Sequence, residues 1–342
     1  MDQAEVRVET TVADAEASAD VAVVGAGPAG LYTAYCAGFR GLSSVIVDAL
    51  PEPGGQVAAL YPEKRIYDVA GHPAVRGREL VDALITQVEP FRPRFLLGRT
   101  AISLAPEEGR GWTIRLEDSG LVRAGAVVIA AGLGRSIPRT LPCLRPYQGR
   151  GVAHHVPRPD EHRDRDVVIV GGGDSAVDWA LALAPIARSV TVVHRRSVFR
   201  AHEHSVKQMY ASGVRVVTDA QVTSCEGNGR LEEVWVRAEE HELKLPAQVL
   251  VGALGFITNL GPIADWGLRM SNRLVLVDGA MRTNLPGVYA VGDICHYEGR
   301  VPLISVAFGE AATAANHAAV SLRPGSRIVP EHSTDINSAN LS

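Results

Sequence analysis

Several features are missing from this chain of 342 residues. No apolar run approaches the roughly 18 residues that a membrane-spanning helix needs. The first twenty residues hold six acids and one base and have no apolar signal-peptide core. The four cysteines form no C-x-x-C pair and no zinc-ligand spacing. The sequence therefore predicts a cytoplasmic protein without a membrane anchor, with reduced thiols at Cys36, Cys143, Cys225 and Cys295.

A strong charge imbalance is also missing. The net charge is −4, and residues 1–20 alone carry −5, so the rest of the chain carries +1. A nearly neutral body predicts no nucleic-acid partner, and the acidic excess predicts an unstructured tail over residues 1–20.

The histidine pairs at 154/155 and 202/204 lack a third ligand at suitable spacing, so no metal site is predicted. The length predicts two domains.

A first nucleotide-binding motif follows the apolar strand at residues 20–24. Gly25, Gly27 and Gly30 form G-x-G-x-x-G before a helix-compatible segment, and the next strand ends on Asp48. The first glycine allows the tight turn, the second lets backbone approach a pyrophosphate, and the third brings helix close to strand. The helix N-terminus then binds the pyrophosphate, and the Asp48 carboxylate accepts hydrogen bonds from the ribose hydroxyls.

The same pattern returns after the strand at residues 166–170, as G-x-G-x-x-A. Here the following strand ends in arginines in place of an acid. Guanidinium groups match phosphate oxygens, which predicts the 2′-phosphate of NADP(H) as ligand. The alternative is a solvated basic turn. The residues predicted to contact this nucleotide are Gly171, Gly173, Asp174, Ser175, Ala176, His194, Arg195, Arg196 and Arg200.

Two dinucleotide motifs in one chain favour one FAD and one NADPH, held so that a hydride passes between them. Three further strand ends, within residues 127–132, 249–255 and 288–293, fit this interpretation. The alternative for each of them is an ordinary buried strand that closes a sheet.

Longer blocks give the chain a family resemblance. From about residue 20 to 335 it resembles the flavoprotein superfamily with two dinucleotide-binding domains. Within that superfamily it is most similar to the thioredoxin-reductase-like (type 2) ferredoxin/flavodoxin–NADP⁺ reductases of bacteria. The blocks that carry this resemblance are LPEPGGQ at 50–56, ALYPEK at 59–64, IYDVAG at 66–71, GGGDSAVDWA at 171–180, HRR at 194–196 with FRAHE at 199–203, and VGDIC at 291–295.

The resemblance implies an α/β fold with two Rossmann-like, three-layer dinucleotide-binding domains, the second inserted in the first. It places the FAD domain at residues 1–137 and 260–342 and the NADPH domain at 138–259. It also implies a homodimer, because in this family a C-terminal extension covers the flavin, often that of the neighbouring subunit. The alternative is that residues 322–342 form a disordered tail.

Site residues also follow from the resemblance. Tyr61 and His332 are expected to stack on the two faces of the flavin, and Gln56 to bind its pyrimidine side. Backbone near Ala101 is expected at the adenine, and Asp293 at the ribityl chain. The expected FAD-contacting residues are Gly25, Gly27, Gly30, Asp48, Gln56, Tyr61, Ala101, Ile137, Asp293 and Thr334.

The missing C-x-x-C separates two activities within the superfamily. A thioredoxin reductase carries this pair shortly before its second glycine motif, and residues 151–160 contain no cysteine. Disulfide exchange needs an attacking thiolate and a resolving thiol, so electrons are expected to leave the flavin directly, for ferredoxin or flavodoxin, with no catalytic side chain. The alternatives are an NADPH diaphorase acting on quinones, iron chelates or free flavins, a thiol–disulfide reductase with a hidden cysteine pair, and a non-enzymatic FAD-bound sensor.

Overall fold

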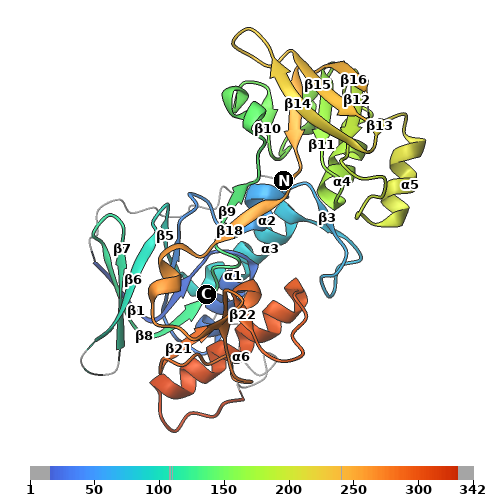
Figure 1. Ribbon diagram of the computed structural model, residues 1–342. Helices are drawn as coiled ribbons and strands as arrows, with labels where there is room; N and C mark the ends of the chain where they lie inside the picture. The colour runs from blue at the N-terminus through green and yellow to red at the C-terminus, as the bar shows by residue number, and fades with distance from the viewer. Residues whose placement is uncertain (1–15, 108, 110, 240, 330–342) are drawn as a thin grey trace. The chain divides into compact units, whose positions relative to one another are not determined.

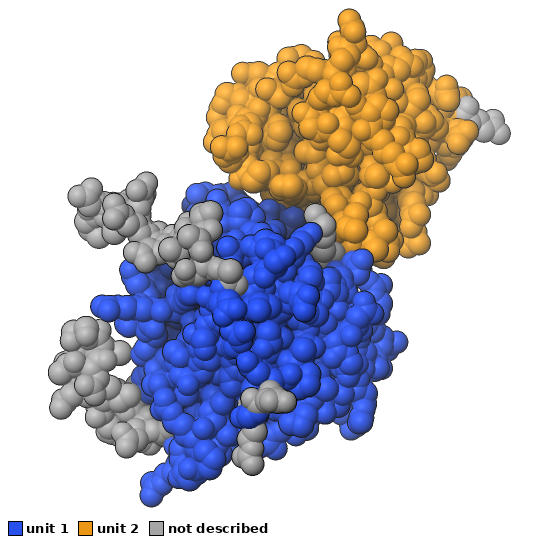
Figure 2. Space-filling model, turned by 90° about the vertical axis from the view of Figure 1, so that its left-hand side faces the viewer, with its two compact units in different colours: residues 1–135, 258–342 blue, residues 136–257 orange. Residues whose placement is uncertain are grey.

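The computed structural model describes residues 16–107, 109, 111–239 and 241–329 (Figure 1). The chain divides into two compact units (Figure 2). Unit 1 comprises residues 1–135 and 258–342, and unit 2 comprises residues 136–257. Both junctions lie two residues before the positions expected from the sequence. The chain crosses between units through β9 (Arg135–Pro138) and β18 (Phe256–Asn259), which pair in a two-stranded sheet.

Unit 1 is built on a seven-stranded sheet. Strands β5, β2, β1, β8 and β21 are parallel, whereas β7 and β6 extend β8 as an antiparallel meander. The strands are β5 (Arg94–Leu97), β2 (Ser44–Asp48), β1 (Glu16–Val24), β8 (Leu121–Ile129), β7 (Gly111–Leu116), β6 (Ala101–Glu107) and β21 (Val288–Ala290).

Two apolar cores lie on opposite faces of this sheet. Because successive strand side chains point to opposite faces, Val21 and Val23 join one core while Ala22 and Val24 join the other. The first core is covered by helices α1 (Pro28–Phe39), α3 (Gly77–Val88) and α6 (Ile304–Leu322). The meander packs on the second. These three layers confirm the predicted Rossmann-like fold.

The expected N-terminal tail is wrong at its last five residues. Residues 16–20 belong to β1, which pairs with the first half of β8, from Glu16 opposite Leu121 onward. Glu16 also forms an ion pair with Arg123 at 2.6 Å. The pairing partner lies about a hundred residues away in the sequence, so local composition carried no sign of it. Residues 1–15 lie outside the described part of the chain.

Shorter elements of unit 1 complete its loops. Helix α2 follows the first glycine turn, and β3 and β4 form a two-stranded antiparallel ribbon. Their bounds are α2 (Gly55–Leu60), β3 (Arg65–Ile66), β4 (Val75–Arg76), β19 (Met270–Ser271), β20 (Leu274–Leu276) and β22 (Cys295–His296), with 3₁₀ turns η1 (Glu89–Phe91), η4 (Gly261–Asp265) and η5 (Gly292–Ile294).

Unit 2 repeats the layered plan with a five-stranded parallel sheet and a three-stranded antiparallel sheet. The parallel strands, in spatial order, are β10 (Val152–Ala153), β17 (Val249–Gly252), β11 (Asp166–Val170), β12 (Ser189–Val193) and β13 (Arg215–Val217). The other elements are β14 (Ala220–Glu226), β15 (Glu233–Ala238), β16 (His241–Pro246), α4 (Asp174–Leu183), α5 (Glu203–Ala211), η2 (Pro142–Tyr147) and η3 (Pro159–His162).

Candidate nucleotide-binding sites

The predicted FAD residues of unit 1 gather at one edge of its sheet. Gly25 follows β1, Asp48 ends β2, and Gly292 with Asp293 follows β21. These are carboxyl ends of parallel strands, where open α/β sheets bind their ligands. Helix α2 is held at this edge, because the backbone N–H of Gly54 donates to the Ala26 carbonyl at 2.8 Å.

The first glycine turn has the shape of an anion cradle. Gly25 has φ +113°, and a Cβ there would overlap the carbonyl oxygen of Ala130. A Cβ at Gly30 would overlap the carbonyl oxygen of Gly25. By contrast, a Cβ at Gly27 would come no closer than 3.9 Å to any neighbour. Gly27 is the N-cap of α1 and no side chain caps it. The N-terminus of α1 therefore has no side-chain cap and has room beside Gly27, as pyrophosphate binding requires.

Asp48 is tied to this turn. Its two carboxylate oxygens accept backbone hydrogen bonds from Ala26 at 2.6 Å and Leu50 at 2.8 Å. Burial raises the pKa of Asp48, and these two hydrogen bonds oppose that shift. Each oxygen keeps a further lone pair for a ribose hydroxyl. The Asp48 carbonyl also accepts from the N–H of Arg99 at 2.9 Å, which brings the buried Ala101 at the start of β6 to this edge.

The remaining expected flavin residues lie as follows. Gln56, on α2, donates from Nε2 to the carbonyl of Gly134 at 3.3 Å. Tyr61 ends α2, and the Lys64 ammonium lies 5.6 Å from its ring centre. Ile137, on β9, is 47% exposed. His332 and Thr334 lie outside the described residues.

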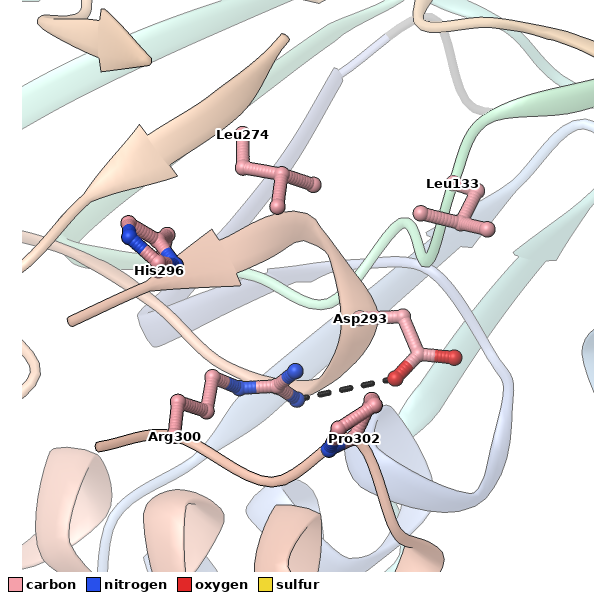
Figure 3. Close-up of a pocket in the computed structure, with 6 residues that line it drawn as sticks. All are labelled: Leu133, Leu274, Asp293, His296, Arg300 and Pro302. Atoms are coloured by element: carbon pink, nitrogen blue, oxygen red, sulfur yellow. Dashed lines mark ion pairs between the residues drawn. The ribbon is translucent and has the colours of Figure 1, made fainter. Parts of the chain in front are cut away.

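Asp293 lines a pocket of about 240 Å³, together with Leu133, Leu274, His296, Arg300 and Pro302 (Figure 3). The Asp293 carboxylate and the Arg300 guanidinium point toward one another across the pocket wall at 3.5 Å. Asp293 remains half-exposed, with 53% of its side chain accessible, whereas the Arg300 side chain is 5% accessible. A carboxylate presented in this way suits the hydroxyl-rich ribityl chain of a flavin.

Sequence reasoning missed Glu310, which holds this turn from within the protein. Its side chain is 2% accessible, and one oxygen accepts from the Gly292 N–H at 2.7 Å. The other accepts from Arg300 Nε at 2.8 Å and from the Tyr297 hydroxyl at 3.1 Å. One feature of the sequence could have indicated this role: Glu310 is the one Asp, Glu, Lys or Arg in the nineteen residues of α6. Almost fully buried charges are rare unless they are paired.

Unit 2 presents a second cradle with the same design. A Cβ at Gly171 would overlap the carbonyl oxygen of Ala253, while one at Gly173 would meet nothing within 4 Å. Gly173 is the N-cap of α4, again without a side-chain cap. Ser175 and Ala176 follow in the first turn, and Asp174 accepts the N–H of His202 at 2.9 Å. The open side of the turn again has room for a pyrophosphate.

The basic group expected beside this cradle divides into two parts. His194 is 7% exposed, and a Cβ at Gly172 would overlap its ring, so the imidazole supports the turn from beneath. Arg195, Arg196 and Arg200 are exposed, and none forms an ion pair with a described residue. Arg200 is fixed to the turn by its backbone N–H, which donates to the Gly172 carbonyl at 2.8 Å. Three guanidinium groups without a carboxylate partner suit a phosphate ester.

All four cysteines are free thiols. Burial raises the pKa of Cys36 and of Cys295 to about 12. Cys143 on η2 and Cys225 on β14 pack on the same apolar cluster of unit 2, and their thiols interact. Burial and this neighbour raise the pKa of Cys225 to about 12. The structure thus brings together a cysteine pair that the sequence did not indicate.

The chain is similar to many known proteins. The model of the pyridine nucleotide-disulphide oxidoreductase family matches residues 19–311. The chain belongs to this family. A ferredoxin–NADP reductase of Salinispora tropica is 54% identical over 92% of this chain and 98% of its own length. A ferredoxin–NADP reductase of Thermus thermophilus is 46% identical over 92% of this chain and 96% of its own length. The predicted resemblance to bacterial ferredoxin–NADP reductases is therefore confirmed.

Solved structures agree on the fold of this family member. A thioredoxin reductase of Lactococcus lactis has a TM-score of 0.74 and 24% identity, and the match covers 89% of this chain and 99% of that one. The thioredoxin reductase of T. acidophilum matches with the same TM-score and identity. Within the described residues, no helix is both long and apolar enough to cross a membrane.

Proposed function

We propose that this chain is an FAD-dependent oxidoreductase that passes electrons between NADPH and ferredoxin. The observation that carries the proposal is the pair of glycine cradles with opposite charges beside them: the carboxylate of Asp48 in unit 1 and the arginines 195, 196 and 200 in unit 2. Relatives named ferredoxin–NADP reductase, 50–54% identical over most of the chain, support it.

The residues present fit both nucleotides. In unit 1 the Gly25–Gly30 turn and the N-terminus of α1 would hold the pyrophosphate of FAD, Asp48 its ribose and Asp293 its ribityl chain. Tyr61 would stack on the flavin ring. When bound, FAD supplies the redox chemistry, taking two electrons with a hydride from NADPH and releasing them one at a time. In unit 2, Arg195 and Arg196 would bind the 2′-phosphate and favour NADPH over NADH.

The thiols support electron exit without disulfide exchange. A thiolate is the nucleophile in that exchange, and three of the four cysteines have a pKa of about 12, so they stay protonated at neutral pH. The thiols of Cys143 and Cys225 also lie away from the predicted nucleotide edge. Ala220 at the start of β14 donates its N–H to the His194 carbonyl, and Cys225 lies roughly 16 Å farther along the strand at about 3.3 Å per residue.

The finer expectations belong to the same proposal. Flavodoxin is the second protein acceptor. A homodimer would let His332 and Thr334 of one chain cover the flavin of its own or the partner subunit, and the cytoplasm would supply the reduced cofactors. These remain predictions.

The deciding experiment is NADPH-driven reduction of the host's own ferredoxins and flavodoxins, beside a quinone, a ferric chelate and free flavin. The expected result is a higher kcat/KM for a ferredoxin than for any small acceptor, with NADPH far better than NADH. Fast reduction of small acceptors alone would make the protein a diaphorase. A bound flavin that NADPH does not bleach would make it a sensor.

A further inference from the structure

The ribbon formed by β3 and β4 presents two exposed arginines at facing positions. We define the basic ribbon as residues 64–78, which contain four Lys or Arg residues and one acid, Asp68. These residues carry +3, and the flanking acids Glu63 and Glu79 reduce the charge to +1 over residues 63–79, on a chain whose net charge is −4. Arg65 and Arg76 are directly opposite each other across the two strands, and both are exposed. Like charges at facing positions destabilise a ribbon, so this pair costs the isolated protein stability.

Internal carboxylates offset only part of this charge. Arg78 pairs with Glu63. Glu79 lies 3.8 Å from Arg76, but about half of each side chain is accessible, and such exposed pairs contribute little. Arg65 has no ion-pair partner among the described residues. Arg65 and Arg76 therefore keep positive charge at the surface that an anionic partner would neutralise.

Apolar side chains stand beside these charges. Tyr67, between the two strands, is 70% exposed. Val301 and Leu303, exposed by 51% and 39%, are on the segment next to it. That segment is joined to the ribbon because the Ser305 hydroxyl donates to the Asp68 carbonyl at 2.8 Å and accepts the Ala70 N–H at 3.1 Å. An aromatic and aliphatic centre with an arginine rim is typical of a protein-binding surface.

The basic ribbon is anchored at the residue expected to stack on the flavin. The Lys64 N–H donates to the Tyr61 carbonyl at 3.1 Å, and its ammonium lies 5.6 Å from the Tyr61 ring centre. At the other end, the N–H of Gly77 donates to the Lys64 carbonyl at 3.0 Å and that of Arg78 to the Pro62 carbonyl at 2.9 Å. A protein bound to the ribbon would therefore sit next to the flavin site, where an electron has the shortest path.

We infer that the basic ribbon, with Tyr67, Val301 and Leu303, is the docking surface for an acidic electron-transfer protein. The occupant to which the inference commits is a ferredoxin with an acidic surface, so it rests on the proposed function. Charge complementarity would steer the encounter, and the apolar centre would hold the complex. Steering of this kind acts mainly on the association rate and weakens with salt.

The test uses the full-length, FAD-loaded enzyme and the variants Arg65→Glu and Arg76→Glu, with Arg115→Glu on β7 as the matched control. Arg115 is an exposed arginine of the same unit, in the meander far from the ribbon (Figure 1). Two acceptors are compared with NADPH as donor: ferredoxin and a neutral quinone. Arg65→Gln and Arg76→Gln repeat the test with a gentler change if a reversal impairs folding.

The expected result is a KM for ferredoxin raised about tenfold at low salt in each reversal variant, and a flatter salt dependence. Quinone reduction should stay unchanged, and Arg115→Glu should match the wild type. Tyr67→Ser should raise the KM for ferredoxin while leaving the salt dependence as it is.

Three outcomes would overturn the inference or its basis. If the ribbon variants and the control reduce ferredoxin equally well, ferredoxin docks elsewhere and the proposed function stands. If size-exclusion chromatography shows that the reversals dissociate a dimer, the ribbon is an interface between copies of this chain. If the wild type does not reduce ferredoxin, the proposed function itself fails.

Discussion

Glu310 offers the sharpest test of how the Asp293 turn is held. Its carboxylate compensates the buried guanidinium of Arg300 and accepts the Gly292 N–H. Removing one member of a buried ion pair typically destabilises a protein by about 3–5 kcal/mol. If Glu310 lost its charge, the Asp293 carboxylate at 3.5 Å would still partly neutralise the Arg300 guanidinium. For Glu310→Gln we therefore expect a loss of about 3 kcal/mol in the free energy of unfolding, and weaker FAD binding because the Gly292–Asp293 turn loosens.

The measurement is urea unfolding of the FAD-loaded protein, combined with titration of the apoprotein with FAD. Glu298→Gln is the control, because Glu298 is an exposed acid two residues before Arg300 and loses the same charge. A surface change of this kind should stay within about 0.5 kcal/mol. The double variant Glu310→Leu/Arg300→Met removes both charges and should recover stability, but not FAD affinity, because Gly292 still lacks its acceptor. A loss below about 1 kcal/mol in Glu310→Gln, with unchanged FAD affinity, would refute this reasoning.

Three further predictions concern other parts of the chain. Replacing Arg195 and Arg196 together by alanine should lower kcat/KM for NADPH by about tenfold or more, since hydrogen bonds to charged groups contribute about 1.5–3 kcal/mol. The kcat/KM for NADH should be unaffected. An equal loss with both nucleotides would contradict 2′-phosphate binding. Cys36 and Cys295, with a pKa of about 12, should react with iodoacetamide at pH 8 roughly a thousandfold more slowly than an exposed thiol. The variants Cys143→Ser and Cys225→Ser should still reduce ferredoxin at the wild-type rate. Loss of ferredoxin reduction in either variant would support a thiol mechanism. Deleting residues 330–342 should change acceptor kinetics while FAD stays bound, and unchanged kinetics would favour the disordered-tail interpretation.

The sequence allowed prediction of those features that depend on neighbours along the chain. A glycine turn between strand and helix is local, so the spacing of Gly25, Gly27 and Gly30 was enough to predict the cradle that the structure contains. The layered fold followed from two such motifs and the family resemblance.

Features made by distant segments were not predictable in this way. The extension of β1 over residues 16–20 depends on β8, and the proximity of Cys143 and Cys225 joins residues 82 positions apart. Glu310 is similar, because its role exists only when α6 packs against the turn after β21. The expected contact of His194 with the nucleotide stays a prediction, and the packing of its ring against Gly172 of the glycine turn could not be foreseen from the sequence.

The insertion of unit 2 between the two parts of unit 1 sets an order for folding during synthesis. On the ribosome, residues 136–257 emerge as a complete unit, whereas the first 135 residues still lack β21 and α6. Strand β21 pairs with β8, and alanines 314, 318 and 319 of α6 fill the core against α1. Unit 1 therefore begins first and finishes last, against the usual N-to-C order of domain folding. Until the last eighty residues are made, its apolar sheet face remains open to chaperones and to misassociation.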